Sequence, residues 1–72
     1  MRRMVTIYQK IEAEIERARQ QFPAFHSQHE AYAVILEELD EFWECVKHDR
    51  DGTRELIQVA AMCVAAIREC GV

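Results

Sequence analysis

The sequence predicts an all-α protein of three helices. Glycine and proline are scarce, with two glycines and one proline in 72 residues, while alanine, glutamate, leucine, arginine and glutamine are abundant. Residues of these five types favour helices, and the breakers fall at only three places, Pro23, Gly52 and Gly71. A chain of this length has room for one domain, so residues 1–72 are expected to form a single helical domain.

The first helix is expected over residues 6–21. Its apolar residues recur in alternating steps of four and three, which places them in one seam: Met4, Tyr8, Ile11, Ile15, Ala18 and Phe22. The charged residues off this seam are expected to be solvated: Glu12, Glu14, Glu16, Arg17 and Arg19. Pro23 prevents the helix from continuing.

The second helix is expected over residues 28–47, with Ser27 as its N-cap and Glu30 closing a capping box. At about 100° per residue, one broad arc is apolar: Ala31, Tyr32, Ile35, Leu36, Leu39, Phe42, Trp43 and Val46. The opposite flank is rich in glutamate, yet it includes Val34 and Cys45. Because a flank meant only for water would not usually include both, it is expected to face a cleft or another protein surface.

The third helix is expected over residues 54–69, with Asp51 or Thr53 as its cap. Along its interior Gln58 is the only polar side chain. A helix that is apolar around most of its circumference must be buried on most sides, and three short helices cannot achieve that for one another. Self-association is therefore expected, as a homodimer or tetramer in which copies complete a four-helix-type bundle around the third helix.

Composition argues against several classes of function. The net charge of -4 disfavours a nucleic acid polymer as partner, because such binding depends on a basic surface. The apolar runs are too short to span a bilayer, and the basic start at residues 1–4 is not followed by the apolar segment of a secretory signal. A cytoplasmic protein with no membrane partner is expected, in which Cys63 and Cys70 are buried thiols rather than zinc ligands.

The most acidic stretch, residues 37–44, contains five carboxylates. Glu38 and Glu41 are three residues apart, so their carboxylates lie on adjacent turns of one helix. Glu55 and Gln58 repeat this spacing on the next helix. If the two helices pack antiparallel, these side chains approach one another, and crowded carboxylates in a partly dry site need a cation to stay ionised. Mg²⁺ suits such a site, because it binds carboxylates together with substrate phosphates.

Residues 29–44 and 55–62 resemble the MazG-like branch of the all-α nucleotide pyrophosphohydrolases. That family carries a Glu-Glu-x-x-Glu motif on one helix and a Glu-x-x-Asp motif on the next. The resemblance implies a helical homo-oligomer that binds Mg²⁺, with Mn²⁺ able to substitute. It also implies a nucleoside triphosphate as substrate, cleaved between its α and β phosphates to give the monophosphate and pyrophosphate.

The motif residues match this family with one departure. Glu37, Glu38 and Glu41 match the first motif. Glu55 matches the first acid of the second motif, whereas Gln58 replaces its aspartate. By this resemblance the metal ligands would be Glu38, Glu41, Glu55 and Gln58, and the catalytic residues would be Glu37 and Glu41. Because an amide brings no charge, Gln58 is expected to weaken Mg²⁺ binding.

Other residues near these motifs allow more than one interpretation. Three cations around the second turn either meet the substrate phosphates or are only solvated residues of the turn: Lys47, Arg50 and Arg54. Trp43 and Tyr32 either stack on a base or pack in the core or an interface. Two non-enzymatic functions also fit the sequence. One is a non-catalytic helical oligomerisation module, which Gln58 favours, and the other is a partner-binding protein whose acids form a solvated face.

Overall fold

A computed structural model describes residues 4–71 of the chain. Within these residues it contains three α-helices and no strand: α1 (Ile7–Gln21), α2 (Gln28–Lys47) and α3 (Thr53–Cys70). Each boundary lies within one residue of its expected position, so the all-α prediction and its three elements are confirmed. The basic Arg2 and Arg3, which entered the expectation about a secretory signal, lie outside the described residues.

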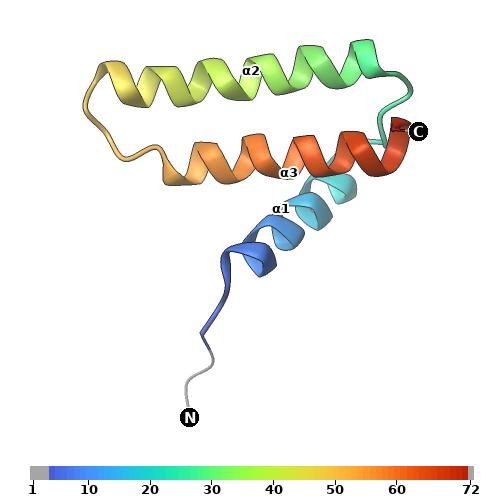
Figure 1. The fold of residues 1–72 in the computed structure, drawn as a ribbon, viewed down its shortest axis with the longest axis horizontal. Helices are drawn as coiled ribbons and strands as arrows, with labels where there is room; N and C mark the ends of the chain where they lie inside the picture. The colour runs from blue at the N-terminus through green and yellow to red at the C-terminus, as the bar shows by residue number, and fades with distance from the viewer. Residues whose placement is uncertain (1–3, 72) are drawn as a thin grey trace.

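The central helix is α3. It forms an antiparallel hairpin with α2, and α1 crosses it obliquely, with its first turn pointing away from the hairpin (Figure 1). In the part of the chain that the structure describes, α1 and α2 each pack on α3 rather than on each other. The surface of α3 between them therefore forms a floor with a helix on either side.

Local hydrogen bonds set the starts of α1 and α2. Thr6 Oγ1 accepts a hydrogen bond from the Gln9 N–H at 3.1 Å, and Gln9 Oε1 accepts one from the Thr6 N–H at 2.8 Å, which completes a capping box. Ser27 Oγ accepts from the Glu30 N–H at 3.1 Å, as expected. The Glu30 carboxylate instead accepts from the His26 N–H at 3.1 Å. The prediction that Glu30 closes a capping box with the Ser27 N–H is therefore wrong, because its carboxylate bonds to the residue before Ser27 instead.

The turn into α3 requires a glycine. Gly52 is buried against Phe42, and a Cβ at this position would lie only 2.6 Å from Phe42 Cδ1. Asp51 Oδ1 accepts hydrogen bonds from the Thr53 N–H at 3.1 Å and from the Thr53 hydroxyl at 2.7 Å. The N-cap of α3 is Gly52, without a side-chain cap hydrogen bond, so the prediction of Asp51 or Thr53 as the cap is wrong: Thr53 is already the first helical residue, and Asp51 bonds to it from outside the helix.

The core of the single chain is small and half of its members are alanines. The buried side chains are Ile15, Ala18, Phe25, Ala31, Cys45, Ala61, Met62 and Ala65. Between Met4 and Gly71 no large side chain is completely buried. Cys63 and Cys70 are only partly buried, so the expectation of two buried thiols is wrong. Cys63 lies on the face of α3 opposite the buried Ala61, and Cys70 packs on the core from the last residue of α3.

The single chain is also less compact than its length allows. Its Cα radius of gyration is 13.2 Å, whereas a compact domain of this length would have about 11 Å. The apolar seam of α1 is only partly buried. Ile15 and Ala18 are buried, whereas Met4, Tyr8 and Phe22 are exposed. Among the described residues, no helix is long and apolar enough to cross a membrane.

An apolar stripe on each helix of the hairpin, together called the outer seam, is exposed except for two half-buried positions, Ala60 and Cys63. On both helices its members recur in steps of four and three: Tyr32, Leu36, Leu39, Trp43 and Val46 on α2, and Leu56, Ala60, Cys63 and Ile67 on α3. At about 100° per residue, these α3 positions lie opposite Ala61 and Ala65, which are fully buried. The outer seam therefore faces away from α1.

Candidate functional site

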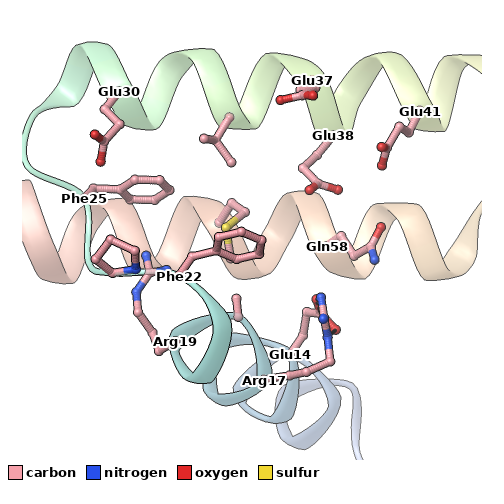
Figure 2. A pocket seen from close by; sticks show the side chains of 14 residues that line it. Glu14, Arg17, Arg19, Phe22, Phe25, Glu30, Glu37, Glu38, Glu41 and Gln58 are labelled. Carbon is pink, nitrogen blue, oxygen red and sulfur yellow. Dashed lines mark hydrogen bonds and ion pairs between the residues drawn. The ribbon is translucent and has the colours of Figure 1, made fainter.

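A cleft of about 540 Å³ opens between α1 and α2, with α3 as its floor (Figure 2). Ligand-binding pockets commonly have volumes of about 300–1,000 Å³. Its lining comes from all three helices and from the α1–α2 connection: Glu14, Arg17, Ala18, Arg19, Phe22, Pro23, Phe25, Glu30, Val34, Glu37, Glu38, Glu41, Gln58 and Met62.

Four of the predicted site residues line this cleft together: Glu37, Glu38, Glu41 and Gln58. The spacing along α2 puts the three carboxylates on adjacent turns, and the antiparallel hairpin brings Gln58 of α3 beneath them. Figure 2 shows the Glu38 and Glu41 side chains pointing from α2 toward α3. Val34 lines the same cleft and Cys45 is buried. The interpretation that the glutamate flank of α2 faces a cleft is therefore confirmed.

Glu38 is the most perturbed carboxylate of the cleft. Its Oε2 atom is buried and finds no hydrogen-bond partner among residues 4–71. Burial raises the pKa of Glu38, and the neighbouring carboxylates of Glu41, Glu14 and Glu37 raise it further. A carboxylate with one oxygen dry and unpaired, and with like charges around it, is unfavourable at neutral pH. A cation in the cleft would relieve both effects.

The α1 wall contributes an acid and a base that sequence reasoning placed in solvent. Arg17 Nε donates to both Glu14 carboxylate oxygens, at 3.1 and 3.2 Å, and Arg17 Nη2 also pairs with Glu14. These bonds raise the pKa of Arg17, and the charge of Glu38 across the cleft adds to the effect. The Glu14 side chain is only 17% exposed. The expectation that Glu14 is solvated is therefore wrong, because α1 crosses α3 in a direction that turns it toward the cleft.

Glu55 does not line the cleft. It lies beside Cys45, whose thiol pKa is raised by burial and further raised by the Glu55 carboxylate. Glu55 precedes Gln58 by three residues, a rise of about 4.5 Å along α3. Of the five residues assigned from the motif resemblance, the structure therefore brings four to one cleft and leaves the fifth nearly one turn away.

The three cations expected to meet phosphates do not line the cleft either. Lys47 Nζ lies 2.5 Å from Glu44 Oε2 and 6.0 Å from the centre of the Trp43 ring. Arg50 follows the end of α2, and Arg54 borders a smaller groove between α1 and α3. Arg17 is the guanidinium of the cleft lining that is affected by the charge of Glu38. No signal in the sequence identified it, because its position depends on how α1 crosses α3.

The other end of the cleft is apolar and is fixed by an ion pair. Arg19 donates to Glu69 from Nε and Nη2, both at 2.5 Å, and its guanidinium carbon lies 4.9 Å from the centre of the Phe25 ring. Glu69 also accepts from the Phe25 N–H at 2.9 Å. The bond from Arg19 lowers the pKa of Glu69. Arg19 is therefore a structural residue, and the expectation that it is solvated is wrong.

The potential metal ligands of the cleft are oxygen atoms. Within residues 4–71, no three His, Cys, Asp or Glu side chains are grouped as a metal site in their own right. Carboxylates and an amide oxygen are nevertheless the ligand types of Mg²⁺ and Mn²⁺, and Mg²⁺ usually takes only one or two carboxylates and completes its shell with water and substrate phosphates. The unpartnered oxygen of Glu38 fits a site of this kind.

Comparison with known proteins adds no relative. No protein-family model, no curated protein and no solved structure matches this chain. The resemblance to the MazG-like pyrophosphohydrolases therefore depends on the motif residues themselves, and the cleft geometry is the independent observation to set beside it.

Proposed function

We propose that the chain is a divalent-metal-dependent nucleotide pyrophosphohydrolase of the MazG-like type, which converts a nucleoside triphosphate to the monophosphate and pyrophosphate. The observation that carries this proposal is the buried, unpartnered Oε2 of Glu38. It lies in a cleft of ligand size that Glu41 and Gln58 also line. A cation bound there would balance the charge of Glu38 and present its remaining coordination positions to phosphate oxygens.

The residues of the cleft have separate proposed roles. Glu38, Glu41 and Gln58 would hold Mg²⁺, or Mn²⁺ in its place, and Glu55 would be a ligand only if its side chain reached past Cys45. When bound, the ion neutralises phosphate charge and lowers the pKa of a coordinated water. Across the cleft, Arg17 would donate to the phosphate oxygens.

The proposed reaction is the hydrolysis of the link between the α and β phosphates. The oxygen of a water molecule forms a bond to the α-phosphorus, and the bond between that phosphorus and the oxygen bridging to the β-phosphate breaks. Glu37 or Glu41 accepts the proton that the water loses, as a general base. Pyrophosphate leaves with the electron pair of the broken bond, and the monophosphate retains the oxygen of the water.

Self-association is the second part of the proposal. The outer seam places apolar positions at steps of four and three on two antiparallel helices, the spacing that packs helices at shallow angles. A second copy related by a two-fold axis would present the same pattern and complete a four-helix bundle with α3 inside. The thin core and the high radius of gyration of the single chain support this arrangement. The cleft lies on the opposite side of the hairpin and would stay open.

A helical oligomerisation module without catalysis is the second candidate, and Gln58 favours it. A neutral amide on the cleft floor reduces the negative charge available to a divalent ion. In this alternative the outer seam would carry the function, and the glutamates of the cleft would be a remnant without turnover.

Pyrophosphate release from the common ribo- and deoxyribonucleoside triphosphates, with Mg²⁺ or Mn²⁺, separates these candidates. We expect metal-dependent release that falls by about 100-fold or more in Glu41→Gln, the usual scale for loss of a general base. Asp40→Asn is the matched control, because Asp40 is an exposed neighbour on α2 that does not line the cleft. No release from any nucleotide, with an intact oligomer, would exclude the enzyme and leave the module.

A further inference from the structure

The cleft has two chemically different ends. Glu38 and Glu41 lie at one end, over Gln58. The rings of Phe22 and Phe25 lie toward the other end. Glu30 and Glu41 are 11 residues apart on α2, so the cleft extends for about 16 Å along the helix at 1.5 Å per residue. A ligand that fills it must be charged at one end and apolar at the other.

The polar residues of the apolar end are already engaged. Both Arg19 nitrogens that face Glu69 donate to it, and the Glu30 carboxylate accepts from the backbone of the connection. What this end offers to a ligand is therefore mainly hydrocarbon and ring surface.

Phe22 is the exposed ring of that surface. Phe22 is 62% exposed, whereas Phe25 is 8% exposed and belongs to the core. The Phe22 N–H donates to the Ala18 carbonyl at 2.8 Å, and Pro23 follows directly, so the backbone that carries the ring is fixed on both sides. In Figure 2 the Phe22 ring extends from the end of α1 toward α2, between Phe25 and Glu38.

We infer that the Phe22 ring is the stacking platform for the base of the nucleotide, at the end of the cleft away from the carboxylates. A planar heteroaromatic ring covers an exposed aromatic face well, and such stacking tolerates different bases. The same ligand carries its anionic phosphates toward the proposed cation, so its two ends match the two ends of the cleft. The position of the phosphates depends on the proposed function, whereas the aromatic platform is a separate property of the cleft.

Two probes test the two ends separately. The riboside of 2-aminopurine has no phosphate and loses fluorescence when its base stacks, so it reports on the aromatic end without metal. Inorganic tripolyphosphate with Mg²⁺ has no base and reports on the carboxylate end. The full-length chain is compared with Phe22→Ala, with Phe22→Tyr, which keeps a ring, and with Tyr8→Ala. Tyr8 is an 81% exposed aromatic on the same helix that does not line the cleft.

We expect the riboside to be quenched by the unaltered chain, by Phe22→Tyr and by Tyr8→Ala. Phe22→Ala should weaken riboside binding about 10-fold or more, the scale of one base stacked on one aromatic ring, and should leave tripolyphosphate binding unchanged. No quenching by the unaltered chain, or equal quenching by Phe22→Ala, would overturn the inference. Failure of tripolyphosphate to bind with Mg²⁺ would instead count against the proposed function and leave the riboside result standing.

Discussion

Arg19 of α1 and Glu69 of α3 form a two-point ion pair, with Arg19 Nε 2.5 Å from Glu69 Oε2 and Arg19 Nη2 2.5 Å from Glu69 Oε1. The two side chains are only 20% and 18% exposed. Because Glu69 also accepts from the Phe25 N–H, one carboxylate joins α1, the connection after it and α3. This joint fixes the wall that α1 contributes to the cleft.

Removing the charge of Glu69 should destabilise the chain measurably. Glu69→Gln leaves the guanidinium of Arg19 without its partner in a mostly buried position, and we expect a loss of about 1–2 kcal/mol. For a chain of this size that loss corresponds to a fall in Tm of about 5–10 °C. Glu12→Gln is the matched control, because the Arg68–Glu12 pair also links α1 to α3 but is half exposed. An equal fall in Tm in both variants would show that the Arg19–Glu69 pair stabilises the fold no more than the Arg68–Glu12 pair does.

The same pair should make stability depend on pH in the acidic range. Arg19 keeps the pKa of Glu69 below its ordinary value, so the folded state releases this proton more readily than the unfolded state does. The stabilisation is therefore present above the ordinary pKa of glutamate and is lost as the pH falls through the lowered folded value. Melts from neutral pH to about pH 3 should converge for the unaltered chain and Glu69→Gln. Parallel curves would contradict this.

Glu38→Gln should stabilise the metal-free chain and remove the stabilisation that a divalent metal gives. The substitution removes a partly buried charge that has one unpartnered oxygen and is crowded by Glu41 and Glu14. We expect the metal-free chain to melt about 3 °C higher or more at neutral pH. The rise in Tm that Mg²⁺ or Mn²⁺ gives the unaltered chain should disappear. Asp40→Asn removes a charge from the exposed side of α2 and should leave both quantities nearly unchanged.

The α2–α3 hairpin and its acidic flank could be predicted from the sequence because they depend on local patterns. The Ser27 cap, the apolar arc and the short turn define an antiparallel pair, and the helical repeat then puts Glu37, Glu38 and Glu41 on one side. The presence of Val34 and Cys45 among the glutamates was enough to predict that this side faces a cleft or another protein surface.

The position of α1 could not be predicted in the same way. A seam identifies which face of a helix packs, but the crossing angle depends on how side chains of both helices interlock. This angle decides that Glu14 and Arg17 border the cleft and that Arg19 reaches Glu69. It also decides that Phe22, read from the sequence as part of the seam, lies exposed in the cleft instead.

Gln58→Asp should strengthen metal binding if Gln58 occupies a ligand position. The substitution adds a carboxylate on the floor of the cleft beneath Glu38 and Glu41, and affinity for divalent ions rises with the number of charged ligands. We expect Mg²⁺ and Mn²⁺ to bind about tenfold more tightly or better by calorimetry, with a lower Tm in the absence of metal because another like charge is present. Ile57→Asp places the same charge on the α1 side of α3 and should not improve binding. Unchanged affinity in Gln58→Asp would contradict the assignment of Gln58 as a ligand.

A single charge on the outer seam should dissociate the proposed oligomer. Leu39 is the central member of the α2 seam and is 45% exposed in the single chain, so a second copy would bury it. Leu39→Glu would then place an unpaired carboxylate in the interface and weaken association by about 100-fold or more, since such burial costs ~3 kcal/mol or more. Ala33→Glu adds the same charge at an exposed position of α2 outside the seam and should leave association unchanged. Sedimentation over a range of concentrations measures both variants. Because the thin core of one chain depends on the partner for further burial, Leu39→Glu should also melt at a lower temperature. A monomeric unaltered chain would exclude the proposed bundle.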